Sequence, residues 1–494
     1  MKYPLLAEIP QTVSTVRSFG GYNHGAKIGD GEFYEMNSLS PDAYPALTVR
    51  KKRGFIQMSN QSAAIVTNLL AVDNLLVWCS MSKLRYIYYS DGSSTYFETA
   101  LPAGVLLPSS GARLAAFGRQ VLIYTGYKKG NAQGYPTALY VTFSGKKLSE
   151  NFTVIEDIPL MDHMTECGNR MWGCRCGSNQ EGVYVNEIYA SELGDLTKWH
   201  TYTTASTASY AASVGVPGEF TGAINFGGYP TFFKEDCILR VYGSYPAQYQ
   251  INTTVCSGVQ SGSHGSLAFH DGILYYKGRS AVYAYDGSMP VPISSALGDR
   301  RYYYACGAFV RSKYYISMLD EQTDECSLFV YDTQSGLWHR EDFTDIKTMA
   351  AFADTAVYVP VSAYNVFCTV TDEKLTPLYG GTSDNAEAEK KVKWSAQTGI
   401  IGADDPANKY ISQIVIRAQL GTESRLSVSV QYDSAGPWLE LIKYRSGGTR
   451  SVNIPIRPKR CDHMRLCLSG EGDAVIYSIS KIMSAGSYVN RPRG

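Results

Sequence analysis

Three cysteines and a histidine form a dense group of potential metal ligands. Cys167, Cys174 and Cys176 lie close together in the chain, and His163 precedes them. Three thiolates and an imidazole can in principle hold zinc. The usual paired C-x2-C spacing is absent, however, and Cys174 and Cys176 alternate as residues on one face of a strand do. We therefore expect no metal and no cofactor, and keep the three cysteines as a weak candidate site.

Signatures of catalytic centres are scarce. The sequence contains no Walker loop, no HExxH motif and no G-x-S-x-G motif. Residues 90–96 loosely match the Asp-box turn of sialidases, but the closing Trp of that turn is missing. The three arginines and the Tyr–Glu pair that a sialidase needs cannot be nominated either. We therefore expect no catalytic residues.

A short sequence pattern recurs seven times and predicts the secondary structure of most of the chain. Each copy joins a small or apolar run, a few turn residues and an aromatic-rich run, as in Ala268-Phe269 before Ile273-Leu274-Tyr275-Tyr276. The anchors fall at residues 72, 117, 167, 226, 269, 309 and 352. Strand-rich repeats with a period near 40 to 45 residues are typical of β-propeller blades. The sequence therefore predicts an all-β fold, with a β-propeller of about seven blades over residues 55–380.

The segments that flank the repeats differ from them in composition. Residues 1–54 are rich in Gly, Pro and turn formers and end in a basic run, so we expect an extended arm that is disordered or orders against another surface. A polar linker follows at 381–389. Residues 390–494 contain about six short alternating runs, such as 425–432, which predict a β-sandwich domain packed against the propeller.

Composition and charge narrow the functional classes. No run approaches the roughly 18 apolar residues of a membrane helix, so we expect no stable membrane insertion. The odd number of cysteines, 11, fits reduced buried thiols, and the chain is expected to fold in a cytoplasm. The formal net charge is zero, but residues 386–494 carry 16 Lys and Arg against 10 Asp and Glu, which leaves residues 1–385 at −6. This asymmetry is either ordinary surface variation or a sign of basic neighbours or of a passing polyanion.

Two passages resemble structural proteins of bacteriophage tails. The first lies in the arm: Phe19-Gly20-Gly21-Tyr22-Asn23, then Asp30-Gly31-Glu32, Asn37-Ser38-Leu39, and Leu47 leading to Arg50 and Arg53-Gly54. The second is Asn169-Arg170-Met171-Trp172-Gly173, followed by Tyr189-Ala190-Ser191, Gly194-Asp195 and Trp199. It is similar to a phrase of the tail nozzle (tail tubular) proteins. The residues that we assign to an assembly arm on this basis are Phe19, Gly20, Gly21, Asn23, Asp30, Glu32, Asn37, Leu47, Arg50 and Arg53.

The resemblance implies a structural component of the virion. In short-tailed phages such subunits form a ring, often a hexamer, around the channel through which DNA leaves. The implied partners are copies of the chain itself and other tail or head–tail connector proteins, and DNA is met only in passage. The protein would be assembled in the host cytoplasm and reside in the tail. A receptor- or glycan-binding propeller is the alternative, and a propeller glycoside hydrolase is the weaker third one.

Overall fold

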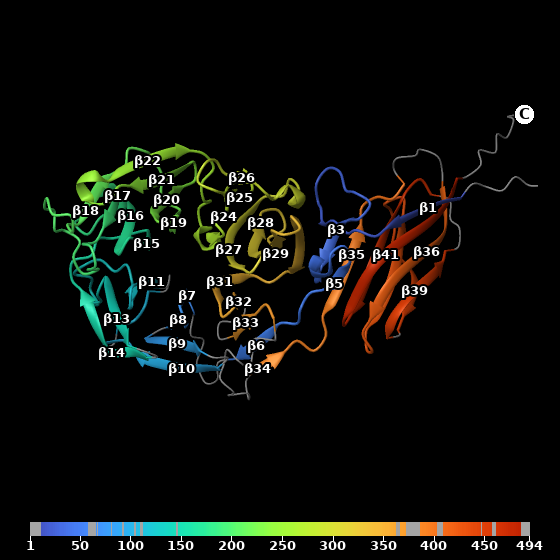
Figure 1. The fold of residues 1–494 in the computed structure, drawn as a ribbon, viewed down its shortest axis with the longest axis horizontal. Coiled ribbons are helices and arrows are strands. Elements are labelled where there is room, and N and C mark those ends of the chain that lie inside the picture. The colour runs from blue at the N-terminus through green and yellow to red at the C-terminus, as the bar shows by residue number, and fades with distance from the viewer. Residues whose placement is uncertain are drawn as a thin grey trace, which may run out of the picture.

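A computed structural model of the chain is all-β (Figure 1). It describes residues 11–57, 66, 68–80, 82–90, 93–102, 105–108, 112–144, 147–361, 366–371, 386–402, 409–445, 447–456 and 461–485. Among these residues the only helical elements are single 3-10 turns, and no helix is long and apolar enough to cross a membrane. Two bodies lie side by side along the long axis, a ring of small sheets and a two-layered sandwich.

The ring consists of seven antiparallel sheets, which confirms the predicted β-propeller. Blade 1 contains β7 (Leu69–Val72), β8 (Leu75–Ser80), β9 (Lys83–Ser90) and β10 (Ser93–Ala100). Blade 2 contains β11 (Arg113–Phe117), β12 (Gln120–Tyr124), β13 (Ala138–Ser144) and β14 (Lys147–Ile155). Blade 3 contains β15 (His163–Cys167), β16 (Arg170–Ser178), β17 (Tyr184–Ala190) and β18 (Tyr210–Ser213). Blades 4 and 5 contain β19 (Gly222–Phe226), β20 (Tyr229–Lys234), β21 (Cys237–Tyr242), β22 (Gln250–Val255); and β23 (Ala268–His270), β24 (Ile273–Lys277), β25 (Val282–Tyr285), β26 (Val291–Pro292). Blade 6 contains β27 (Tyr302–Val310), β28 (Lys313–Asp320), β29 (Cys326–Asp332) and β30 (Leu337–Asp342).

The seven repeated phrases correspond to the first hairpin of each blade. Every anchor residue lies at or next to the end of a first strand, and the aromatic run after it forms the second strand. The longest repeat, in blade 3, owes its length to the connection 191–209 between β17 and β18. The repeat length in the sequence therefore corresponds to one blade, and the one repeat that is much longer contains one long loop.

The seventh blade closes the ring with a strand from the other end of the propeller. It joins β31 (Ile346–Phe352), β32 (Thr355–Pro360) and β33 (Val366–Thr369) to β6 (Gly54–Gln57), and β34 (Ala386–Ala388) adds a fifth strand. In this pairing Phe55 lies opposite Cys368. Since β6 comes before blade 1 in the chain, the ring opens only if this pairing breaks.

Apolar layers fill the space between neighbouring blades. Separate buried clusters join blades 1 and 2, 2 and 3, 3 and 4, 4 and 5, 6 and 7, and 7 and 1. Blades 5 and 6 share the largest cluster, which continues into the sandwich. No blade can bury both of its faces alone, so the closed ring is the stable unit.

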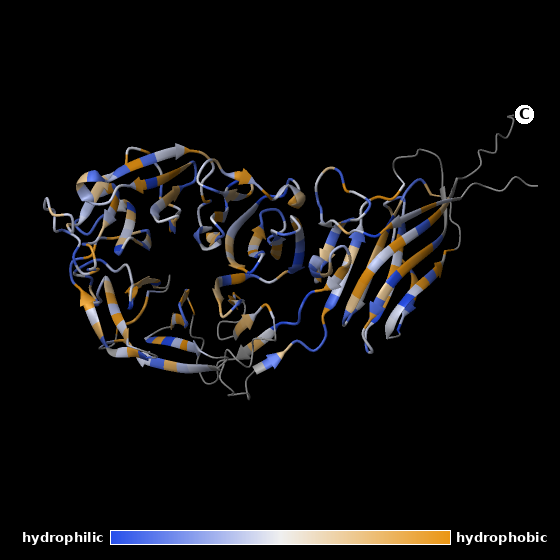
Figure 2. Ribbon diagram, viewed as in Figure 1, coloured by the Kyte–Doolittle hydropathy of each residue, from blue (hydrophilic) through white to orange (hydrophobic). Residues whose placement is uncertain are grey.

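The sandwich contains strands from both ends of the chain. One sheet has the order β39-β36-β41-β5-β4, with β1 also paired to β41, and the other has the order β2-β3-β35-β40-β37-β38. Hydrophobic and hydrophilic residues alternate along these strands (Figure 2). The bounds are β1 (Gln11–Val16), β2 (Gly21–Tyr22), β3 (Glu32–Asn37), β4 (Leu39–Ser40), β5 (Leu47–Val49), β35 (Lys393–Thr398), β36 (Lys409–Leu420), β37 (Arg425–Tyr432), β38 (Leu439–Tyr444), β39 (Gly448–Pro455), β40 (Met464–Glu471) and β41 (Ala474–Ala485).

The predicted separate arm at 1–54 is therefore corrected. Residues 11–49 form five short strands of the sandwich, and residue 54 starts the closing strand of the propeller. These strands have two to six residues and strong turn formers between them, so they have little periodicity of their own. The expected linker is corrected in part, since 386–388 pair with β6; residues 381–385 lie outside the described part of the chain.

Candidate functional site

The residues assigned to the assembly arm lie inside the sandwich or at its junction with the propeller. Phe19 is buried, and its ring stacks on that of Phe33 with the centroids 5.8 Å apart. Gly20 donates its backbone N–H to the carbonyl of Gly31 at 2.8 Å. Leu47 is fully buried in the same core. These contacts hold strands of one chain together, and a role of the same residues in assembly stays a prediction.

The polar members of the set tie turns to the sandwich sheets. Asn23 donates its side-chain amide to Glu32 Oε2 at 2.6 Å, which fixes the turn between β2 and β3. Asp30, at the tip of that turn, forms an ion pair with Lys481 of β41 at 3.3 Å. Both contacts lie within a single chain, and they order the segment without a neighbour.

Strand β30 of blade 6 forms the propeller side of the junction. Gly21 lies so close to it that a Cβ atom would be 2.4 Å from the carbonyl oxygen of Trp338. Ser38 donates its backbone N–H to the carbonyl of Arg340 at 3.0 Å. The guanidinium of Arg340 in turn pairs with Glu35 and donates through Nε to Asn37 Oδ1 at 2.7 Å. The junction is therefore built from backbone contacts and from a buried ion pair.

Two arginines of the predicted basic run extend this network. Arg50 forms a bidentate ion pair with Glu389, with N···O distances of 2.7 and 3.0 Å. Arg53 is buried and pairs with Glu341 at 2.9 Å and with Asp342. Burial raises the pKa of Asp342, but Arg53, two hydrogen bonds from Thr344 and Arg50 together outweigh burial and hold that pKa below its ordinary value. The two arginines of the basic run are thus paired with carboxylates of the same chain.

The cysteine group does not form a ligand set. Cys167 and Cys174 lie in the apolar layer between blades 3 and 4, and burial raises the pKa of both thiols. Cys176 is partly exposed, with its Sγ 3.2 Å from the hydroxyl of Tyr184. Within the described ranges, no group of three or more His, Cys, Asp or Glu side chains could hold a metal ion.

The second phage-like passage builds a loop rather than a reactive centre. The Arg170 side chain is 2% exposed and donates to the carbonyls of Ser191, Ala208 and Ser206 at 2.7, 2.6 and 2.7 Å. Trp199 donates its indole N–H to the carbonyl of Leu196 at 2.8 Å. These residues fasten the long connection 191–209 onto blade 3.

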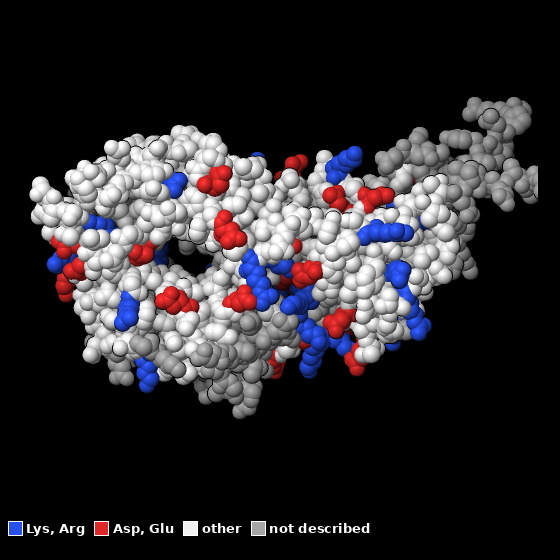
Figure 3. Space-filling model, in the orientation of Figure 1, with Lys and Arg blue, Asp and Glu red and all other residues white. Residues whose placement is uncertain are grey.

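The central channel opens at one mouth into a cavity of about 640 Å3 (Figure 3 shows an opening through the ring). Arg113, His264 and Lys347 are among its lining residues. Its enclosed position in the channel lowers the pKa of His264 to about 4 by desolvation, and Arg113 adds to this effect, so the imidazole is neutral near pH 7. Among the described lining residues Asp345 is the one carboxylate. Glycoside hydrolysis ordinarily uses two carboxyl groups, so this cavity lacks the usual pair.

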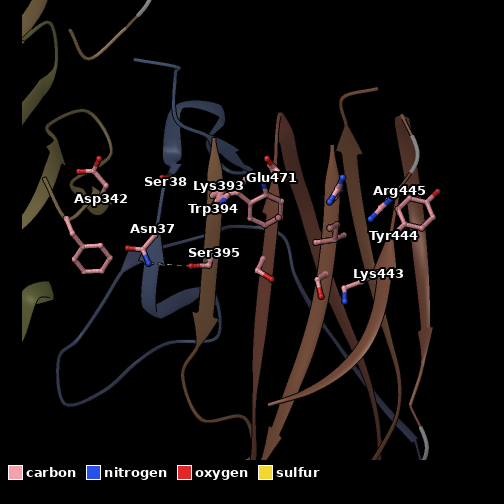
Figure 4. Close-up of a pocket in the computed structure, with 16 residues that line it drawn as sticks. Asn37, Ser38, Asp342, Lys393, Trp394, Ser395, Lys443, Tyr444, Arg445 and Glu471 are labelled. Atoms are coloured by element: carbon pink, nitrogen blue, oxygen red, sulfur yellow. Dashed lines mark hydrogen bonds between the residues drawn. The ribbon is translucent and has the colours of Figure 1, made fainter. Parts of the chain in front are cut away.

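A second concavity crosses the outer face of the sandwich next to the junction (Figure 4). We call it the sandwich groove; its volume is about 580 Å3. Its floor is a cross-strand row of small polar side chains that ends in a lysine: Asn37, Ser395, Ser469, Ser427 and Lys443.

A parallel row borders the floor of the sandwich groove. Lys393 lies opposite Glu471, which lies opposite Arg425, and Arg445 also lines the groove. The lining therefore holds four cationic side chains against two carboxylates, and one of these, Asp342, already pairs with Arg53. Among the described residues neither Arg425 nor Arg445 forms an ion pair. The groove is a positively charged surface rich in hydrogen-bond donors, and sequence reasoning missed it because its residues come from five strands of the sandwich and from β30 of the propeller.

Comparisons with known proteins assign no family to the chain. No protein-family model matches the chain, and no curated protein matches it. The propeller domain of the trilobed protease from Pyrococcus furiosus is similar, with 9% identity and a TM-score of 0.39 over 63% of this chain and 96% of that one. PorZ, a surface component of the type-IX secretion system of Porphyromonas gingivalis, has 10% identity and a TM-score of 0.38. That match covers 71% of this chain but 43% of PorZ. At such identities no function can be transferred.

Proposed function

We propose that the protein is a structural subunit of a bacteriophage tail that assembles into a ring around the DNA exit channel. The observation that carries the proposal is the role of the residues behind the resemblance. Gly21 and Asn37 join the sandwich to blade 6, and Arg170 fastens a blade-3 loop. Each is buried or closely packed in the framework, as expected for a protein whose work is to hold a shape.

The rigidity of the molecule supports the same proposal. The ring is closed by β6, and the apolar cluster of blades 5 and 6 continues into the sandwich without interruption. Tyr22 of the sandwich contacts Phe329 of blade 6 edge to face, with the centroids 5.5 Å apart. A subunit with one continuous core keeps its surfaces in fixed relative positions, which a closed ring requires.

Antibody labelling of phage particles tests the proposal. Virions from the phage that encodes the chain are labelled with antibodies against the propeller and viewed by electron microscopy. We expect label at the tail, and native mass spectrometry of the purified chain should give one closed oligomer. Label that is absent from particles, together with a monomeric chain, would contradict the proposal.

The channel-mouth cavity favours a receptor- or glycan-binding propeller as the second candidate. Tyr304, which is 65% exposed, lines the cavity, and Arg113 and Lys347 line the same cavity. An exposed ring beside cationic donors suits an acidic sugar. A glycan array separates the two functions: saturable binding that Tyr304→Ala abolishes, shown by a monomeric chain, would favour this candidate.

A further inference from the structure

The net charge differs more between the propeller region and the rest of the chain than between residues 1–385 and 386–494. The propeller region, residues 54–385, has 22 Lys and Arg against 30 Asp and Glu, a net charge of −8. The remaining residues, 1–53 and 386–494, have 23 against 15, a net charge of +8. Since residues 11–49 belong to the sandwich, the parts of the sequence that supply the two bodies have net charges of opposite sign.

The positive body concentrates donors in the sandwich groove. Arg425 and Arg445 line it, as does Lys443, which pairs with Glu440 at 2.9 Å. The serine hydroxyls of its floor are half-buried, and that of Ser427 donates to Glu440 at 3.2 Å. Charged donors of this kind form strong hydrogen bonds with carboxylates, and arginine can bind them in a bidentate manner. The groove therefore fits a protein surface that carries carboxylates.

The negative body has such a surface at the opposite end of the long axis, on the rim that bears β17 and β18 (Figure 1). A cleft of about 730 Å3 there is lined by four carboxylates and by exposed Tyr202. Tyr184, with 71% of its side chain exposed, lies on the same blade. Aromatic residues are enriched at protein interfaces. The four acidic residues, which we call the rim acids, are Glu156, Asp157, Glu181 and Glu187.

We infer that the sandwich groove is the docking surface for a second copy of this chain, whose rim acids face the groove. The inference rests on the proposed ring. Beyond the ring itself, it names the two surfaces through which neighbouring copies meet. Because the groove and the rim are different parts of the chain, the contact between copies is heterologous. A heterologous contact closes into a ring when the rotation between copies permits it, which a two-fold symmetric contact does not do.

Charge reversal in the full-length chain tests the inference. The groove variant carries Arg425→Glu and Arg445→Glu, and the rim variant carries Glu156→Lys and Glu181→Lys. We expect each to weaken self-association about tenfold or more, since like charges then face each other. The chain that carries all four changes should regain assembly, because the charges of the groove and of the rim are then again opposite in sign. Native mass spectrometry over a dilution series measures the oligomer fraction, and circular dichroism verifies the fold.

The matched control reverses two exposed arginines on the other sheet of the sandwich, Arg417→Glu and Arg450→Glu, and should leave assembly within about twofold of the parent. A ring that survives the groove and rim variants, or that the control disrupts equally, would overturn this docking surface while leaving the ring in place. A parent chain that stays monomeric at every concentration would overturn the ring itself.

Discussion

His339 on β30 lies at the centre of the junction, fully buried, with neither ring nitrogen hydrogen-bonded within the described part of the chain. Burial lowers its pKa to about 3, and the nearby Lys313 adds to this effect. Asp42 and Glu341 also face it, and Asp42 opposes the shift. The imidazole is therefore neutral in the folded protein over the whole physiological range.

This burial predicts an acid-sensitive junction. The unfolded chain binds a proton at His339 below about pH 6.5, whereas the folded chain does not, so stability falls as the pH drops. Between pH 7 and pH 5 one such group costs about 2 kcal/mol. Urea unfolding at pH 7 and pH 5 measures this: between the two pH values the free energy of unfolding of His339→Phe should fall by about 2 kcal/mol less than that of the parent. Equal losses in both proteins would contradict the prediction; His163 and His264, whose pKa values are also lowered, leave a residual slope in both.

Arg170 allows a second test at the same scale. Arg170→Met leaves the buried carbonyls of Ser191 and Ala208, and the part-buried carbonyl of Ser206, without their donor, which should destabilise the protein by about 3 kcal/mol. We expect a lower melting temperature and faster protease cleavage within 191–209. Arg119→Met, at an exposed arginine in the β11–β12 turn, is the control and should change neither. Unchanged cleavage in the Arg170 variant would show that the loop is held by other contacts.

At the scale of elements, the contact between β2 and β30 depends on one glycine. Gly21 has φ of +77°, and its missing Cβ leaves room for the carbonyl of Trp338. Gly118 has φ of +55° and open space around it, so alanine there meets backbone strain alone. We predict that Gly21→Ala destabilises the protein by about 2 kcal/mol more than Gly118→Ala, as measured by urea unfolding. Equal effects would mean that β2 can shift without loss.

The elements also show what a sequence can reveal. The blades were predictable because each repeats the same hairpin, and the alternation in 425–432 was enough to identify β37. The segment 11–49 was not predictable, since its strands are short and their partners, such as β41, lie more than 400 residues away. The sandwich groove was equally hidden, because only the register of β3, β35, β40, β37 and β38 brings its residues into rows.

For the whole molecule, the N-terminal segment is a structural part of the sandwich. Removing residues 1–50 deletes β1 to β5 and uncovers the apolar cluster shared with blades 5 and 6. We expect rapid hydrogen exchange in β35, β36 and β41 of the truncated chain, while β12 and β16 of the propeller stay protected. Sandwich strands that remain protected would show that the C-terminal strands fold alone. The same truncation should also abolish assembly.

The proposed function and the docking surface both require the full-length chain to form a ring. Negative-stain electron microscopy of the purified protein at near-physiological salt tests this directly. We predict class averages of closed rings with an open lumen, in which the sandwich of each copy lies against the propeller of the next. Isolated two-lobed particles at every protein concentration would contradict it.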